Sequence, residues 1–465
     1  MTMNENKNSP LAGGSSKALY FIGIGGIGMS ALARYYHTQG WRVSGYDKTV
    51  TALTKELEES GIAIHYEENV GSIPKDVEMV VYTPAIPKEH KELLYYQQEG
   101  YKVVKRSDVL QIITESSFNL CIAGTHGKTT ITTMTAHLLR DTGYGCNAFL
   151  GGISVNYGTN FWSDERNVCV IEADEYDRSF LKLSPDIAII SSMDPDHLDI
   201  YGTAEAMEQA FIDFSGKIKP GGLLISKYGL KRGSELKGTN HLTYSLDDDK
   251  ADVYAKNVRM KNGSYEYDVI IKENEIRNVL LNMGGLHNIE NSLAAIAAAS
   301  SLHIDAEKIR AAVASFKGVK RRFQYIIRND KHVFIDDYAH HPEELRALIN
   351  GAKGLFSDKK CTIIFQPHLY SRTRDFVEGF AEVLNKADEI FLLPIYPARE
   401  LPIEGITSEL VAGKMDPEKV RVVTKDELME LLKRRVLENS RPELLITAGA
   451  GDIDMLVAPI KQILS

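Results

Sequence analysis

A glycine-rich stretch with one lysine stands between an apolar run and a threonine-rich run. Its seven residues are Gly124, Thr125, His126, Gly127, Lys128, Thr129 and Thr130. The usual Walker A spacing is G-x-x-x-x-G-K-[ST], but here Ile122 stands five positions before Gly127, so the first glycine is displaced. The parts that hold a phosphate are still present. Glycines let backbone N–H groups face an anion at a helix N-terminus, Lys128 supplies a positive charge, and the Thr129 hydroxyl can reach Mg²⁺. The stretch therefore predicts an ATP site.

A second glycine cluster lies much closer to the N-terminus. Gly23, Gly25 and Gly28 form a G-x-G-x-x-G pattern, with Gly26 inside it, and Asp47 ends the next apolar run. Such a turn presents backbone N–H groups to a diphosphate, and an NAD-binding fold keeps its ribose acid where Asp47 stands. From this segment alone, an NAD-dependent oxidoreductase is a fair alternative. The ATP loop downstream favours another enzyme, because a dehydrogenase has no use for ATP.

Acidic residues and a histidine end two later apolar runs. Glu172 opens the motif EADEYD, and His197 stands between acids in MDPDHLDIYG. The carboxyl ends of parallel strands are where ligands bind in open α/β sheets. Mg²⁺ prefers oxygen ligands, and one imidazole beside phosphate oxygens is compatible with that preference. Taken singly, most of these acids are better explained as helix caps or solvated loop residues.

Strand-like and helix-like runs must position these groups, and they alternate along the whole chain. The alternation predicts α/β units with mostly parallel sheets and helices on both faces. A polar stretch at 233–280 has the alternation of antiparallel strands. We expect a disordered tail at 1–16, a first domain at 17–110, a central domain at 111–317 and a last domain at 318–465.

Length, charge and cysteine usage narrow the class of protein. The 465 residues suit about three domains, and the net charge of −9 without a basic block argues against duplex nucleic acid. No apolar run reaches the roughly 18 residues of a membrane span, and the N-terminus lacks a signal-peptide core. Four scattered cysteines without CxxC indicate reduced thiols. We expect a cytoplasmic monomer or weak homodimer without a membrane partner.

Several motifs occur in a recognisable order. The Gly124–Thr130 loop is followed by EADEYD, DHLD, HNIEN, RRF and DDYAHHP. With these motifs the chain resembles the Mur ligase family, the ATP-dependent amide-forming enzymes of peptidoglycan assembly, over nearly its whole length beyond the tail. The resemblance implies a Rossmann-like N-terminal domain that holds a UDP-sugar, a central P-loop domain that holds ATP, and a Rossmann-like C-terminal domain that closes over the site. It also explains why one chain has two anion-binding loops: one would hold the diphosphate of the nucleotide sugar, and the other would hold the triphosphate of ATP.

The resemblance further implies an activity. The motifs GIGGIGMS, YTPAIP, FQPHLYSRT and GAGDI favour addition of L-alanine to the lactyl carboxylate of UDP-N-acetylmuramate through an acyl phosphate. ATP, UDP-N-acetylmuramate and L-alanine are then the expected small-molecule partners, and Mg²⁺, with Mn²⁺ as an alternative, is the expected metal. A recycling ligase that adds a preformed peptide to the same nucleotide sugar remains an alternative. An NAD-dependent oxidoreductase or a non-enzymatic nucleotide binder is a more distant one.

Roles for individual residues also follow from the resemblance. The UDP-sugar would meet the Gly23–Gly28 turn, Asp47 and Thr83. ATP would meet the Gly124–Thr130 loop, Arg322 at the γ-phosphate, and a set on the adenine and ribose side comprising His287, Asn288, Asn291 and Asp336. Thr129, Glu172 and His197 would hold the metal, and Lys128, His197 and Arg322 would act in catalysis.

The last domain would supply the contacts to the amino acid and the muramyl group. The expected residues are Tyr338, His340, His341, His368, Arg372 and Arg374. The family pattern often has arginine directly after the histidine of QPH, whereas this chain has Leu369. Arg372 and Arg374 are therefore the candidates for a substrate carboxylate. A base for the amine is not identifiable from the sequence, and His197, His340 and His341 are only candidates.

Overall fold

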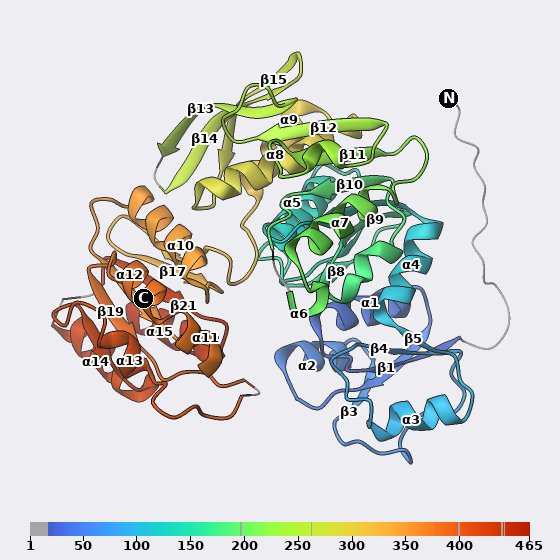
Figure 1. Ribbon diagram of the computed structural model, residues 1–465, viewed down its shortest axis with the longest axis horizontal. Helices are drawn as coiled ribbons and strands as arrows, with labels where there is room; N and C mark the ends of the chain where they lie inside the picture. Colours follow the sequence, from blue (N-terminus) through green and yellow to red (C-terminus); the bar gives the residue numbers. More distant parts are fainter. Residues whose placement is uncertain (1–16, 196–197, 262, 399, 439, 441) are drawn as a thin grey trace.

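The computed structural model describes residues 17–195, 198–261, 263–398, 400–438, 440 and 442–465. The predicted tail at 1–16 and His197 lie outside these residues. The described chain forms three α/β domains in sequence order, coloured blue, cyan to yellow, and orange to red in Figure 1. The predicted fold class is therefore confirmed.

The first domain is a five-stranded, wholly parallel sheet in the order β3-β2-β1-β4-β5. Its strands are β1 (Ala18–Ile22), β2 (Arg42–Tyr46), β3 (Ala63–His65), β4 (Met79–Tyr82) and β5 (Val103–Lys105). Its helices are α1 (Ile27–Thr38), α2 (Ala52–Glu59), α3 (Lys91–Gln98) and α4 (Arg106–Ser116). The strand order reverses between β1 and β4, and ligands of open α/β sheets bind outside the carboxyl ends at such a point. The predicted boundary after residue 110 falls inside α4, a helix that contacts both β5 of this domain and η1 of the central domain.

The central domain is built on a ten-stranded sheet in the order β15-β14-β13-β12-β11-β10-β6-β9-β7-β8. Its strands are β6 (Phe118–Ala123), β7 (Asn147–Phe149), β8 (Phe161–Trp162), β9 (Val168–Glu172), β10 (Ile187–Ile190), β11 (Leu223–Lys227), β12 (Asn240–Ser245), β13 (Val253–Lys261), β14 (Ser264–Ile271) and β15 (Asn274–Leu281). Its helices are α5 (Lys128–Asp141), η1 (Tyr176–Lys182), α6 (Leu198–Tyr201), α7 (Ala204–Ser215), η2 (Gly233–Glu235), α8 (Leu286–Ser301) and α9 (Ala306–Ser315).

The polar stretch at 233–280 differs in part from its prediction. β13, β14 and β15 pair antiparallel as expected, but β12 pairs parallel with both β11 and β13. The prediction failed at β12 because a polar and apolar alternation reports one solvated face and not strand direction.

The last domain carries a six-stranded sheet in the order β16-β17-β21-β18-β19-β20, parallel except for β16. Its strands are β16 (Gln324–Arg328), β17 (Val333–Asp337), β18 (Cys361–Phe365), β19 (Glu389–Leu392), β20 (Val420–Val422) and β21 (Leu444–Ala448). Its helices are α10 (Pro342–Leu355), α11 (Tyr370–Asp375), α12 (Val377–Leu384), α13 (Ser408–Ala412), α14 (Lys425–Leu437), η3 (Asp452–Leu456) and α15 (Val457–Leu464). Within the described part of the chain, no helix is both long and apolar enough to cross a membrane.

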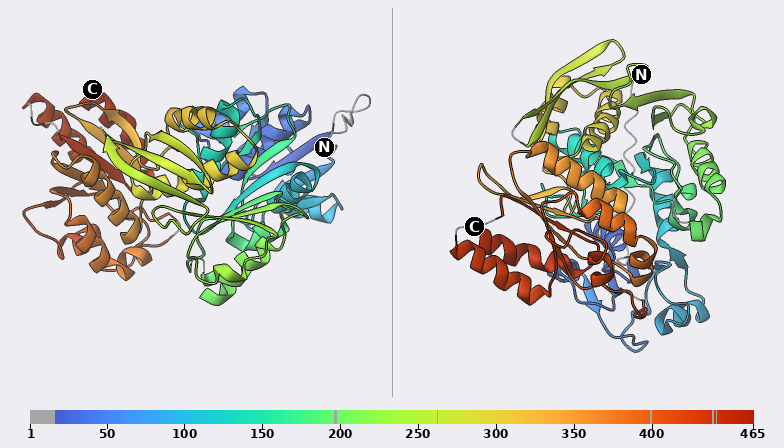
Figure 2. Two further views of the ribbon diagram at one scale, coloured as in Figure 1. Left: turned by 90° about the horizontal axis from the view of Figure 1, so that it is seen from above. Right: turned by 60° about the vertical axis from the view of Figure 1, so that its left-hand side comes forward.

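The first two domains share a hydrophobic core, whereas the third packs around its own. Leu19 and Ala31 of the first domain belong to the same buried cluster as Ala123 and Ile171 of the central domain. The clusters on the two faces of the last sheet consist of residues from that domain. The left view in Figure 2 agrees with this division, since the orange and red domain lies to one side of the other two. The first two domains therefore pack together as one unit, which carries both glycine turns of the site.

Candidate active site

The predicted phosphate loop joins β6 to α5, and its backbone is shaped to receive an anion. Gly127 is the N-cap of α5 with φ +82°, a left-handed conformation that favours glycine. A Cβ added there would lie 2.6 Å from Oδ1 of Asn291 on α8, so space also requires glycine. The first turn of α5 has no side-chain cap and no acidic residue. Its backbone N–H groups and the positive end of the helix dipole are therefore available to a phosphate.

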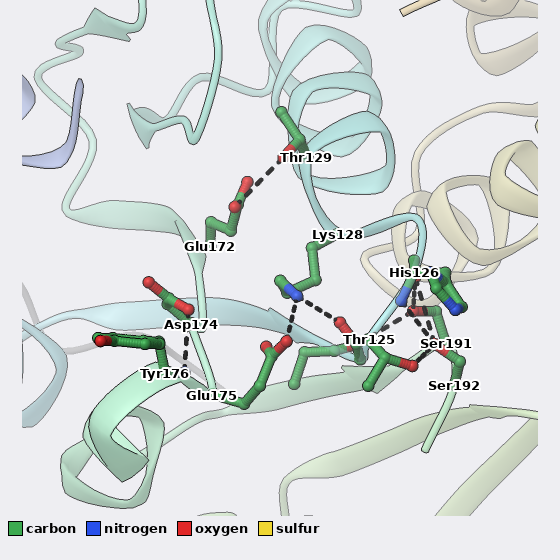
Figure 3. A network of polar contacts seen from close by, with 12 residues as sticks. Thr125, His126, Lys128, Thr129, Glu172, Asp174, Glu175, Tyr176, Ser191 and Ser192 are labelled. Carbon is green, nitrogen blue, oxygen red and sulfur yellow. Dashed lines mark hydrogen bonds and ion pairs between the residues drawn. The ribbon is translucent and has the colours of Figure 1, made fainter. Parts of the chain in front are cut away.

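Lys128, the first residue of α5, is held by two oxygen atoms. Its Nζ donates to the carbonyl oxygen of Gly124 at 2.7 Å and to Oε1 of Glu175 at 2.6 Å (Figure 3). The Glu175 side chain is only 1% exposed. Burial raises the pKa of Glu175, against the opposing effect of the Lys128 charge. The sequence placed Glu175 among several acids after β9 and did not single it out as the partner of this lysine.

Two serines at the end of β10 brace the loop from the neighbouring strand. The hydroxyl groups of Ser192 and Thr125 lie 2.8 Å apart, and the backbone N–H of His126 donates to Ser192 Oγ at 2.7 Å. The hydroxyl of Ser191 donates to the carbonyl oxygen of His126 (Figure 3). Sequence reasoning missed both serines. The sequence shows that both serines follow a buried apolar run. Only the sheet order shows that this strand, β10, lies beside β6 and so brings the serines to the loop.

Glu172, the last residue of β9, links the phosphate loop to the opposite side of the site. Its Oε1 accepts a hydrogen bond from Thr129 Oγ1 at 3.2 Å, and its Oε2 accepts one from the Gly151 N–H, also at 3.2 Å. Burial raises the pKa of Glu172, while Lys128 and the Thr129 hydroxyl oppose that shift. Hydroxyl and carboxylate oxygens are donors that suit Mg²⁺. The third predicted metal ligand, His197, lies outside the described residues, and in the described ranges no three His, Cys, Asp or Glu residues cluster as a metal site.

A cavity of about 470 Å³ opens over the phosphate loop. All predicted loop residues from Thr125 to Thr130 line it, as do the predicted adenine-side residues His287, Asn288 and Asn291 at the start of α8. Asn288 and Asn291 are buried and bonded to each other at 3.1 Å, and Asn288 also donates to the carbonyl oxygen of Gly284. The structure thus brings the start of α8 to the phosphate loop.

The last domain also lines this cavity, with Arg322, Asp337 and residues at the start of α10 that include Glu343 and Glu344. Asp337 accepts hydrogen bonds from the backbone N–H groups of Phe323 at 2.6 Å and Ala339 at 2.7 Å. The predicted residue Asp336 does not line the cavity. Its buried carboxylate accepts a hydrogen bond from Thr447 at 2.6 Å, and burial raises its pKa to about 6. Neighbouring residues of a strand face opposite sides of the sheet, so only one of these two carboxylates can face the cavity.

A second cavity, of about 340 Å³, lies between the first glycine turn and the central domain. The predicted residues Gly26, Gly28 and Thr83 line it together with Glu172. Gly23 and Gly25 belong to the same turn but do not line the cavity. The Asp47 carboxylate accepts a hydrogen bond from the Gly25 N–H at 2.7 Å, so in this structure it fixes the turn.

Four of the six residues predicted to meet the amino acid lie together in the last domain. The rings of Tyr338 and His340 are 5.4 Å apart, those of His340 and His368 are 5.9 Å apart, and Arg372 Nη1 lies 3.3 Å from His368 Nδ1. Burial lowers the pKa of His340, and burial together with the nearby cations lowers that of His368 to about 4.

The other two residues of this set have different surroundings. His341 is the N-cap of α10, where its ring accepts from the Glu343 N–H and packs against Phe376. Arg374 is exposed and paired with its neighbour Asp375 at 2.8 Å. Both fit local structural roles, because capping and neighbour pairing satisfy their polar groups without a ligand.

Comparison with known proteins gives matches along almost the whole chain. Family models described as the Mur ligase family catalytic domain, the Mur ligase middle domain and the Mur ligase glutamate ligase domain match residues 18–117, 122–299 and 321–451. A UDP-N-acetylmuramate–L-alanine ligase of Phocaeicola vulgatus is 48% identical over 97% of this chain and 98% of its own.

Solved structures agree with these matches. A UDP-N-acetylmuramate–alanine ligase of Thermotoga maritima superposes with a TM-score of 0.81 at 28% identity, over 96% of this chain and 98% of its own. A murein peptide ligase of Psychrobacter arcticus shares the fold with a TM-score of 0.65 at 21% identity, over 97% and 99% of the two chains. Three family models match in the expected order, and a relative that aligns over almost the full length of both chains is 48% identical. The chain therefore belongs to the Mur ligase family.

Proposed function

We propose that this protein joins L-alanine to the lactyl carboxylate of UDP-N-acetylmuramate with consumption of ATP, an early step of peptidoglycan precursor synthesis. One observation carries the proposal beyond the similarity of the relatives. Glu172 lines the cavity beside the first glycine turn and accepts a hydrogen bond from Thr129, which lines the cavity over the phosphate loop. The two anion-binding sites therefore adjoin at one carboxylate, as required when a substrate carboxylate must meet a terminal phosphoryl group.

Each cavity has a substrate that suits it. The turn at Gly23, Gly25, Gly26 and Gly28, with Asp47 and Thr83 beside it, binds the UDP-sugar. The loop from Gly124 to Thr130 binds the ATP phosphates, and the start of α8 binds the adenine side. In place of Asp336, Asp337 is the acid of β17 that faces ATP, since Asp337 lines the cavity.

The reaction begins with phosphoryl transfer. A lactyl carboxylate oxygen attacks the γ-phosphorus of ATP, the bond to the β-phosphate oxygen breaks, and an acyl phosphate and ADP form. Such a transfer depends on positioning and on neutralising charge at the transferring group. Lys128 contributes at the loop, where ATP draws its Nζ from Glu175, and Arg322 contributes from the last domain.

Amide formation follows. The unprotonated amine of L-alanine attacks the acyl carbon, phosphate leaves, and the nitrogen loses a proton. Burial lowers the pKa of His340, which favours the neutral imidazole, the form of a histidine that can accept a proton, and His340 is therefore the candidate base. Arg372, beside His368, pairs with the carboxylate of the amino acid. Closure of the last domain over the first two domains excludes water from the acyl phosphate.

The donor set at the junction also fits a divalent cation. Thr129 and Glu172 would hold Mg²⁺ there, and Mn²⁺ accepts the same oxygen ligands. The ion would neutralise charge on the phosphate oxygens. Buried free cysteines at all four positions suit the cytoplasm, where ATP is also available.

Phosphate release tests the proposal directly. The protein is mixed with ATP, Mg²⁺ and UDP-N-acetylmuramate, and either L-alanine or a tripeptide is added as acceptor. We expect phosphate release that depends on both L-alanine and the nucleotide sugar. Release with the tripeptide alone would assign the recycling reaction instead, and no release with either acceptor would refute a ligase of this nucleotide sugar.

A further inference from the structure

The cavity beside the first glycine turn has an unusual charge balance for a site that receives an anion. Among the described residues that line it, Glu172 and Asp174 are acidic, and Arg106 is the one that carries a positive charge. A nucleotide sugar with a diphosphate and a lactyl carboxylate would be repelled by the two acids. The single arginine is therefore the group that decides whether such a substrate is attracted into this cavity.

Arg106 is the first residue of α4, and its guanidinium lies against the start of α1. A Cβ added to Gly28 would be 2.3 Å from Arg106 Nη1 and 3.1 Å from its Cζ. Gly28 has no left-handed backbone angle, and the atoms nearest to an added Cβ all belong to the Arg106 side chain, which would have to move. The start of α1 has no side-chain cap and no acidic residue in its first turn. A guanidinium and free backbone N–H groups therefore face the same region.

In this structure Arg106 has a weak, replaceable partner. Its Nη2 lies 3.5 Å from Oδ2 of Asp174, which belongs to the central domain. The two side chains are 23% and 40% exposed, and ion pairs with this much solvent contribute little to stability. Oδ1 of Asp174 accepts a hydrogen bond from the Tyr176 N–H, so this acid stays in place when the arginine moves.

We propose that Arg106 binds the diphosphate of the nucleotide sugar, and that Asp174 is the counter-ion which holds its guanidinium until the substrate arrives. The identity of the nucleotide sugar rests on the function proposed above. The diphosphate is favoured over the lactyl carboxylate because the guanidinium lies at the start of α1, whereas the carboxylate must reach the phosphate loop beside Glu172. A guanidinium also binds phosphate oxygens in a bidentate manner, which lysine cannot do.

Binding measurements on an arginine variant test this assignment. Dissociation constants for UDP-N-acetylmuramate and UDP-N-acetylglucosamine are measured by calorimetry at fixed salt in the parent and in Arg106→Gln. The second nucleotide keeps the diphosphate and lacks the lactyl carboxylate. We expect both to bind about 10- to 100-fold more weakly, as for the loss of one charge-assisted contact. Lys105→Gln is the matched control, because Lys105 precedes Arg106 but pairs with Asp177 and does not line the cavity.

A second variant changes binding in the opposite direction. Asp174→Asn releases Arg106 from its partner and should tighten both nucleotides severalfold, and this gain should shrink when Arg106→Gln is also present. ATP affinity reports that each variant is folded. If Arg106→Gln loses it, Arg106→Lys is used and should still weaken both nucleotides.

Three results would overturn the inference or its basis. Unchanged affinity of Arg106→Gln for both nucleotides would remove Arg106 from substrate binding. A loss confined to UDP-N-acetylmuramate would assign the arginine to the lactyl carboxylate. Failure of the parent protein to bind either nucleotide sugar would instead refute the proposed function, and the inference with it.

Discussion

Replacing Gly151 by alanine displaces the Glu172 carboxylate without removing it. A Cβ on Gly151 would lie 2.2 Å from both carboxylate oxygens of Glu172, whereas ordinary contacts begin near 3.4 Å. Gly151 has no left-handed backbone angle, so the methyl group is the whole perturbation. The carboxylate must retreat by about 1 Å, which lengthens its hydrogen bond to Thr129. A misplacement of this size can lower a rate about 100-fold.

Phosphate release that depends on UDP-N-acetylmuramate and L-alanine is the assay for Gly151→Ala. We expect kcat to fall about 100-fold while ATP affinity and the melting temperature stay near those of the parent. Gly354→Ala is the matched control, because an added Cβ on this α10 residue meets nothing within 4 Å. Full activity of Gly151→Ala would show that the position of Glu172 does not matter for the reaction. A loss of activity that merely follows a loss of folding would remove the support for this reasoning.

Other variants test the remaining contacts. Lys128→Met should abolish activity and destabilise the fold by about 3 kcal/mol, because the buried Glu175 carboxylate loses the compensating charge of Lys128. Lys128→Met/Glu175→Gln should regain stability in urea unfolding but not activity, and a double variant no more stable than the single one would contradict a stabilising ion pair. Burial raises the pKa of Asp336 to about 6, so the titration of this carboxylate should lower the unfolding free energy of the parent as the pH rises from about 4 to 6. Asp336→Asn should lose up to about 3 kcal/mol less over that interval, and parallel pH profiles would refute this. Arg322→Ala should lower kcat about 10³-fold with the ATP dissociation constant changed less than about tenfold, whereas equal losses in both would assign Arg322 to ground-state binding.

The sequence by itself determined the parts of the site that are local. The phosphate loop was predictable because its glycines, Lys128 and Thr129 stand at spacings that a strand-to-helix turn converts directly into geometry. The first glycine turn and the three α/β domains followed from alternation and short motifs for the same reason. Glu172 was identified as a metal candidate from its place at a strand end.

Only the tertiary structure decided which distant groups meet. Glu175 holds Lys128 across 47 positions, and Ser192 braces Thr125 across 67. These pairs depend on β6 lying between β9 and β10, and sequence order does not give that arrangement.

The choice between neighbouring acids also required the fold. Asp336 and Asp337 are adjacent residues of the same type, so the sequence does not distinguish them. Strand pleating turns Asp336 toward Thr447 and Asp337 toward the ATP cavity. Arg106 gave no local signal, because its significance comes from a domain boundary that places it beside Gly28 and Asp174. Local spacing fixes what a loop can bind, whereas packing between strands and domains fixes which charges share a cavity.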